Sequence, residues 1–110
     1  MKQIDALAAL AALAQDTRLA VFRHLVGVGP GGASAGDIAH ALKVAPPTLS
    51  FHLKALEHAG LIASERQSRS IIYSADYERM RALLGFLTDD CCQGRPEICG
   101  LRVKRKDCAS

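Results

Sequence analysis

Cysteine, long apolar runs and aromatic residues are scarce over most of this 110-residue chain. No cysteine occurs before Cys91, so the chain lacks the dispersed cysteines of a disulfide-stapled secreted domain. No apolar run is long enough to span a bilayer, and the N-terminus has no basic region followed by an apolar core and a cleavage site. These absences predict a reduced, cytoplasmic protein without a secretory signal.

Excess positive charge is also missing from most of the chain. The net charge is +3, and the last ten residues account for all of it, because they hold four basic residues against one acidic residue. The other hundred residues carry ten basic and ten acidic side chains. Contact with nucleic acid therefore has to come from local patches that are duplicated by symmetry. The basic tail either adds to them or is simply a solvated end.

The chain does have enough apolar residues, nearly half, for one globular domain with a modest core. Residues 2–14 predict a helix so apolar that it packs on another element or another subunit. A second helix is expected over residues 17–26, with Asp16 as its N-cap. The glycine-rich segment 27–32 then breaks the helix, and it is not a phosphate loop because it lacks Gly-Lys-Ser/Thr. One face of the first helix is marked by Ile4, Leu7, Ala8 and Ala11, and the inward positions expected in the second helix are Leu19, Phe22 and Val26.

A helix-turn-helix is predicted over residues 34–59. Ser34 and Asp37 have capping-box spacing at the start of its first helix. A turn of three residues separates the two helices. Pro46 and Pro47 suit the first turn of the second helix, where a backbone N–H would be unpaired in any case.

The second of these helices has two different faces. Leu49, Leu53 and Leu56 recur at helical spacing and form a narrow apolar stripe. The opposite face is small, mixed and weakly basic, which suits a helix in a DNA major groove, although an ordinary amphipathic core helix is the alternative. His52 lies toward the buried edge of the helical wheel, so a structural role is the alternative to DNA contact for this residue. The candidate DNA contacts on this helix are Pro47, Thr48, Ser50, Phe51, His52 and Lys54.

Two short strands, over residues 61–65 and 70–74, predict a hairpin directly after that helix. The expected tip, residues 66–69, carries Arg66 and Arg69. These arginines would meet phosphates or enter the minor groove of DNA. A hairpin in this place is a wing, and an ordinary polar hairpin is the alternative.

A last helix is expected from Tyr77 to Leu87 or slightly beyond, with Asp76 as its cap. Together with the apolar first helix, its apolar stripe predicts a homodimer sealed by the terminal helices, with packing inside one subunit as the alternative. The expected interface residues are Ile4, Leu7, Tyr77, Met80, Leu84 and Leu87. The expected fold is mainly α with a small β-hairpin. It is a winged helix-turn-helix in the order helix, helix, helix, helix, strand, strand, helix.

Three segments resemble the ArsR/SmtB family of small winged-helix metalloregulators. They are Leu13-Ala14-Gln15-Asp16-Thr17-Arg18-Leu19, Thr48-Leu49-Ser50-Phe51-His52-Leu53-Lys54-Ala55-Leu56 and Ile71-Ile72-Tyr73. The resemblance implies a dimeric repressor that leaves its double-stranded DNA operator when it binds a metal or metalloid. The sequence departs from the family pattern at Phe51, at Gln67-Ser68 in the wing and at Ala45 before the recognition helix.

The cysteines indicate the inducer. Cys91, Cys92 and Cys99 are expected just past the last helix, and they resemble the C-terminal arsenic site of some family members. The family's cysteine site in the recognition motif and its histidine site on the last helix are absent. Three thiolates without a histidine or carboxylate also favour a soft trivalent ion. As(III) is therefore the expected inducer, with Sb(III) as a further candidate. Residues 1–90 would form the DNA-binding and dimerisation domain, and residues 91–110 the inducer segment and tail.

Other functions stay open at this point. A further cysteine, Cys108, would allow a four-sulfur site for zinc, cadmium or lead, although Cys-x-x-Cys spacing is missing. Thiol redox or persulfide sensing is a second alternative. Cys99 and Arg105 have the Cys-x5-Arg spacing of phosphatase and arsenate-reductase loops. Because no strand precedes them and no helix follows, an enzyme is the remote alternative, and no catalytic cofactor is expected.

Overall fold

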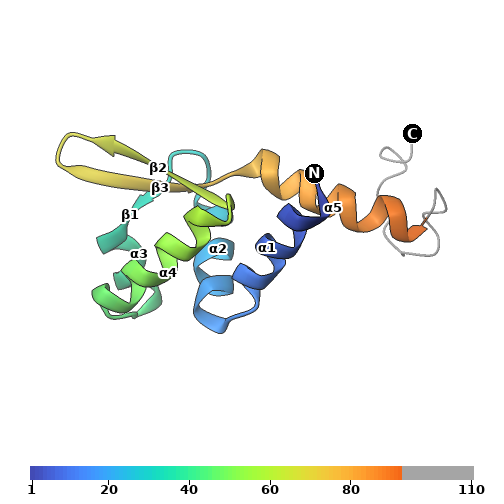
Figure 1. Ribbon diagram of the computed structural model, residues 1–110. Helices are drawn as coiled ribbons and strands as arrows, with labels where there is room; N and C mark the ends of the chain where they lie inside the picture. The colour runs from blue at the N-terminus through green and yellow to red at the C-terminus, as the bar shows by residue number, and fades with distance from the viewer. Residues whose placement is uncertain (93–110) are drawn as a thin grey trace.

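The computed structural model describes residues 1–92, and it describes side chains through Thr88. Five helices and three strands make up this part of the chain (Figure 1). In order they are α1 (Gln3–Leu13), α2 (Asp16–Val28), β1 (Ala33–Ser34), α3 (Ala35–Leu42), α4 (Pro46–His58), β2 (Ile62–Gln67), β3 (Ser70–Ala75) and α5 (Tyr77–Cys92). The predicted fold, mainly helical with a hairpin after the fourth helix, is confirmed. None of the helices described is long and apolar enough to cross a membrane.

Local chemistry explains the helix-turn-helix formed by α3 and α4. The Ser34 hydroxyl accepts a hydrogen bond from the Asp37 backbone N–H at 3.1 Å, which confirms the predicted cap. Lys43 ends α3 in the left-handed conformation, with a φ of 56°. The next helix begins with two prolines after Ala45, which provides no side-chain cap. The chain therefore reverses within three residues and places α4 against α3.

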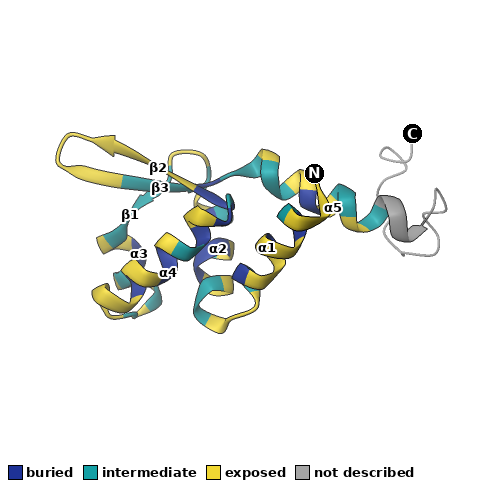
Figure 2. Ribbon diagram, in the orientation of Figure 1, coloured by how far each residue is buried: buried dark blue, intermediate teal, exposed yellow. Residues whose placement is uncertain are grey.

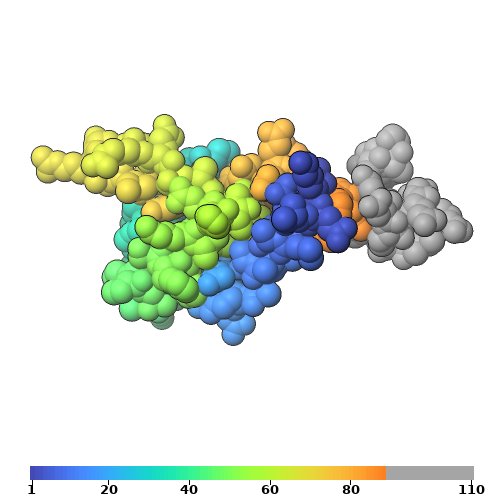
Figure 3. Space-filling model, viewed as in Figure 1, coloured from blue at the N-terminus to red at the C-terminus, as the bar shows by residue number. Residues whose placement is uncertain are grey.

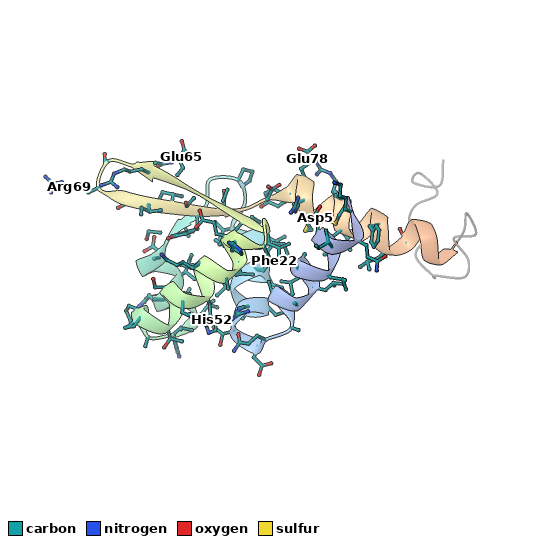
Figure 4. The ribbon with its side chains drawn as sticks, viewed as in Figure 1. Asp5, Phe22, His52, Glu65, Arg69 and Glu78 are labelled. Atoms are coloured by element: carbon teal, nitrogen blue, oxygen red, sulfur yellow. The ribbon has the colours of Figure 1, made fainter. Side chains whose placement is uncertain are left out.

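The core lies where α2, α3 and α4 meet the base of the hairpin. Leu49, Leu53 and Leu56 are all buried, so the predicted inward face of α4 is confirmed. The α4 stripe packs in one cluster with Phe22 of α2 and Ile38 of α3, and Figure 4 shows Phe22 between the helices. Figure 2 shows that buried and exposed residues alternate along α4. Burial of one face alone leaves the other side of α4 free to touch a partner.

The first helix buries its small residues, and the second buries a face that differs in part from the one predicted. On α1 the core side consists of Ala6, Ala9 and Ala12, whereas Ile4 and Leu7 are exposed. Alanine lets two helix backbones approach more closely than leucine would, so the small residues face inward. The inward face of α2 centres on Val21, Phe22 and Leu25, and the prediction that Leu19 faces inward is wrong. Asp16 is the first residue of α2, and Gln15 is the N-cap, whose side-chain oxygen accepts from the Arg18 N–H at 2.9 Å.

The sheet contains one strand more than expected. The order is β1-β3-β2, with both pairs antiparallel, and β1 pairs through Ala33 and Ser34 alone. A strand of two residues has too few positions to show a period-two pattern, which is why the sequence did not predict it. Gly32 precedes it with a φ of +74°, and a Cβ on this residue would lie 2.5 Å from the Tyr73 carbonyl oxygen. The glycine-rich connection therefore ends in a fixed contact with β3.

The last helix is longer than predicted. The Asp76 carboxylate accepts from the Arg79 backbone N–H at 3.0 Å and caps α5, as expected. The helix then continues five residues past Leu87, to Cys92. No glycine or proline lies between Leu87 and Gly94, so nothing in that segment ends the helix earlier. The expectation that Cys91 and Cys92 follow the last helix is wrong, because both belong to its final turn.

Candidate nucleic-acid interface

The outer face of α4 presents a row of exposed side chains. Phe51 is 63% exposed, an unusual state for a large aromatic residue. The other exposed candidates predicted from the sequence are Pro47, Thr48, Ser50 and Lys54. This row mixes hydroxyl, apolar and cationic groups on one side of a helix, which is the chemistry that base edges and phosphates require. An exposed phenyl ring is able to touch a thymine methyl group.

His52 lies differently from its neighbours. Only 7% of its surface is exposed, and its Nδ1 accepts a hydrogen bond from the Arg18 Nε at 3.1 Å. Burial, and then the positive charge of Arg18, lower the pKa of His52 below its ordinary value of 6.5. The side chain is therefore a neutral acceptor directed at α2, and Figure 4 shows it on the side of α4 that faces α2. This geometry agrees with a structural role for His52, which the sequence left open as the alternative to DNA contact.

Arg18 is the residue that the sequence pattern missed. Its guanidinium carbon lies 5.6 Å from the centre of the Phe51 ring, and that ring meets the His52 imidazole edge-to-face at 5.4 Å. A cation over an aromatic face is attracted by the ring's quadrupole. One charged residue of α2 is therefore held at the surface of α4 by two neighbouring α4 side chains. The one sequence signal was its place in the segment Leu13–Leu19, which carried part of the family resemblance.

An open groove of about 800 Å³ runs between α1 and α4. Small residues form much of its wall, among them Ala8 and Ala11 of α1 and Ala55 of α4. Arg18 and Lys54 line the same groove, so the cation from α2 and the cation from α4 share one surface. Glu57 is also present, and it accepts a hydrogen bond from the Ser64 hydroxyl at 2.7 Å.

The wing projects from the opposite end of the domain to α5 (Figures 1 and 3). Arg66 pairs with Ile71 within the β2–β3 ladder, and the strands continue to the pair Gln67 and Ser70. The tip is therefore the two residues Ser68 and Arg69 and not the four predicted. Ser68 has a φ of 58°, in the left-handed region that glycine adopts more easily. Both arginines are exposed, and Figure 4 shows Arg69 extending from the tip.

The residues predicted for a dimer interface fall into two groups. Ile4 and Leu7 of α1 are 72% and 58% exposed, and Leu84 and Leu87 of α5 are 53% and 39% exposed. Tyr77 and Met80 are half-buried against the chain's own core. The Tyr77 hydroxyl donates a hydrogen bond to the Val26 carbonyl oxygen at 3.1 Å, which joins the start of α5 to α2.

The predicted inducer site lies at the far end of α5. Cys91 and Cys92 belong to the helix, whereas Cys99 and Cys108 lie outside the described residues. The expected domain boundary between residues 90 and 91 falls within the same helix. Among the side chains that the structure does describe, no three His, Cys, Asp or Glu residues are grouped to hold a metal ion.

The chain is similar to known proteins. Residues 13–65 match the family model described as a helix-turn-helix domain. The HTH-type transcriptional regulator YgaV of Escherichia coli (strain K12) is 31% identical over 88 residues, which cover 80% of this chain and 87% of that protein.

Two solved structures resemble the chain closely. An ArsR-like transcriptional regulator from Rhodococcus sp. RHA1 has a TM-score of 0.74 at 24% identity and covers 93% of each chain, a likeness that shows the fold. The homodimeric winged helix-turn-helix DNA-binding domain of a possible ArsR-family regulator from Mycobacterium bovis has a TM-score of 0.62 at 26% identity. It covers 81% of this chain and 82% of that one.

Proposed function

Because the chain belongs to the ArsR/SmtB family of winged helix-turn-helix transcriptional regulators, we propose that it is an arsenite-responsive repressor. A homodimer binds an inverted-repeat operator and releases it when As(III) binds Cys91, Cys92 and Cys99. The observation that carries the proposal is the length of α5, which joins the exposed apolar residues Leu84 and Leu87 and the cysteine pair in one helix. An ion bound at that pair therefore acts on the same element that we assign to the dimer.

The donor set supports a soft trivalent ion. Thiolates are soft ligands, and As(III) takes three of them in a pyramid that leaves its lone pair uncovered. Sb(III) has the same preference and is the further candidate inducer. Cys91 and Cys92 supply two of the three sulfurs, and the third, Cys99, follows them after a glycine and a proline that are able to turn the chain back.

The helical backbone at the cysteine pair gives the mechanism its first step. Neighbouring residues of an α-helix point about 100° apart around the axis. We propose that the last turn of α5 opens when Cys91 and Cys92 bind one ion together. Binding therefore changes the end of a dimer helix, and the change reaches DNA affinity if the free and DNA-bound dimers hold that end differently. Couplings of this kind are usually about 1–3 kcal/mol.

The exposed apolar residues of α1 and α5 support the dimer. The two helices contact each other within the chain, so Ile4, Leu7, Leu84 and Leu87 belong to neighbouring elements. Exposed large apolar residues on neighbouring helices are typical of an interface that another subunit covers. Twofold symmetry then brings two copies of α4 and two wings to one face of the duplex, with the recognition helices about 34 Å apart.

The test is release of DNA by arsenite from single-cysteine variants. The probe is a fluorescent duplex selected from a random-sequence library by the wild-type protein, and binding is followed by anisotropy under a phosphine reductant. We expect Cys91→Ser, Cys92→Ser and Cys99→Ser each to bind the duplex as the wild type does and to stay bound when As(III) is added. Cys108→Ser is the matched control and should still release it.

A panel of Sb(III), Cd(II), Zn(II) and hydrogen peroxide separates the other inducers. Release by Cd(II) or Zn(II) alone would assign the site to those metals. The peroxide arm is run without the phosphine, which would consume the peroxide. Release by peroxide alone, reversed when the reductant is added back, would assign the site to thiol oxidation. Arsenite release from Cys99→Ser would overturn the three-cysteine site.

A further inference from the structure

We propose that Arg18 of α2 is a DNA phosphate contact, and that His52 of the recognition helix positions Arg18 instead of contacting a base. The proposal depends on DNA binding by the helix-turn-helix and is independent of the inducer. It begins from the hydrogen bond between Arg18 Nε and His52 Nδ1, 3.1 Å long and partly buried. This bond links residues 34 positions apart in the sequence and joins α2 to α4.

The position of His52 shows why it is a poor reader of bases. Its side chain is 7% exposed, and its Nδ1 is already engaged by Arg18. Contact with a base edge requires a polar atom that reaches into the groove, and the neighbours Ser50 and Phe51 are exposed while His52 is not. A neutral imidazole whose Nδ1 accepts a hydrogen bond carries its own hydrogen on Nε2. His52 is thus suited to hold a cation in place without adding a charge of its own.

The surroundings of Arg18 show where that cation is held. One hydrogen bond fixes its Nε, and the Phe51 ring lies 5.6 Å from its guanidinium carbon. The structure shows no carboxylate paired with it in the part of the chain that it describes. Arg18 also lines the groove that Lys54 and His58 of α4 share. A guanidinium that is held at one edge and lies over the face of a ring keeps its other N–H donors for an anion.

DNA backbone phosphate is the anion that fits this place. Phosphate contacts come from arginine side chains beside the recognition helix, and they set the register of that helix in the groove. Arg18 stands next to Phe51, on the face of α4 that we assign to the major groove. Contact between Arg18 and a phosphate would therefore fix how α4 enters the groove while contributing no sequence preference itself.

The experiment measures how the dissociation constant depends on salt. Log affinity is linear in log salt concentration, and each phosphate contact contributes about 0.9 to the slope on B-DNA. We expect Arg18→Ala to reduce the slope by about 1.8 for a dimer with one such contact per subunit. It should weaken the library-selected duplex and a scrambled duplex by the same factor, because phosphates carry no sequence information.

Arg23→Ala is the matched control, because Arg23 is an exposed arginine of the same helix outside the groove. Its slope should equal that of the wild type. An unchanged slope in Arg18→Ala, in protein whose circular dichroism shows it folded, would overturn the phosphate contact. Weakening confined to the selected duplex would do so as well, because it would place Arg18 on a base edge.

The role of His52 is tested in a double-mutant cycle. His52→Leu should lower the salt slope in the same direction as Arg18→Ala, and His52→Gln, which keeps an acceptor, should retain more of it. In the Arg18→Ala background, His52→Leu should have no further effect on the affinity for DNA. A loss of affinity of equal size in both backgrounds would show that His52 contacts DNA by itself and would overturn the positioning role.

Discussion

At the scale of single residues, burial distinguishes two adjacent aromatic side chains that were both candidate DNA contacts. Phe51 and His52 are adjacent on α4, yet Phe51 is 63% exposed and His52 is 7% exposed. The helical wheel predicted this division correctly, because the spacing of Leu49, Leu53 and Leu56 fixes which side of the helix is inward. It does not predict Arg18, because contact between residues of different helices depends on how those helices pack.

The lowered pKa of His52 predicts a dependence of stability on pH. Unfolded chains bind a proton at this histidine near its ordinary pKa of 6.5, whereas the folded protein resists binding it until lower pH. The full contribution to stability is therefore present above pH 6.5 and is lost as the pH falls from 6.5 toward the folded pKa. We expect that, as the pH is lowered below 6.5, the urea concentration at the midpoint of unfolding decreases more steeply in the wild type than in His52→Leu. Equal pH profiles would contradict a buried neutral imidazole.

At the scale of elements, Gly32 fixes where β1 joins the sheet. A Cβ at this residue would lie 2.5 Å from the Tyr73 carbonyl oxygen, and its φ of +74° disfavours any other residue. We expect Gly32→Ala to lower the free energy of unfolding by about 2 kcal/mol or more. Gly31→Ala is the control, because no atom lies within 4 Å of its added Cβ, and it should change that free energy by less than about 0.5 kcal/mol. Similar losses of unfolding free energy for both variants in urea titrations would show that the close contact with Tyr73 is not the cause of the loss in Gly32→Ala.

The elements also show what a sequence pattern is able to predict. The stripe of α4, the Ser34 cap and the Asp76 cap were each predicted, because a helix end or a buried face needs particular residues at fixed spacing. The inward face of α1 was not predicted, because on a helix rich in alanine and leucine the choice of face depends on how closely its partner approaches. The position of the cysteine pair relative to the helix end was also missed, because α5 lacks a stop signal between Leu87 and Gly94.

At the scale of the whole molecule, the exposed leucines of α5 predict the effect of a charge on assembly. Leu84 is 53% exposed on the helix that we assign to the dimer. Leu84→Glu should therefore convert a dimer to monomers in sedimentation velocity, because a carboxylate is costly to bury between two subunits. Ile71 is 43% exposed and pairs with Arg66 near the tip of the wing, so Ile71→Glu should leave the dimer intact. Monomers in both variants, or in neither, would contradict the assignment of the interface.

The hydrogen bond from the Tyr77 hydroxyl to the Val26 carbonyl anchors the beginning of α5 to α2. Leu83 is the last side chain of α5 that is buried in the chain's own core, and Phe86 packs half-buried against that core, among the side chains that the structure describes. The helix beyond Phe86 is a lever arm, and at about 1.5 Å per residue Cys92 lies about 9 Å along it. A rotation of about 10° at Phe86 would carry the cysteine end by about 1.6 Å. Because of this geometry, a fluorophore pair placed across the cysteine ends of the dimer would report small rotations of α5 with the greatest gain.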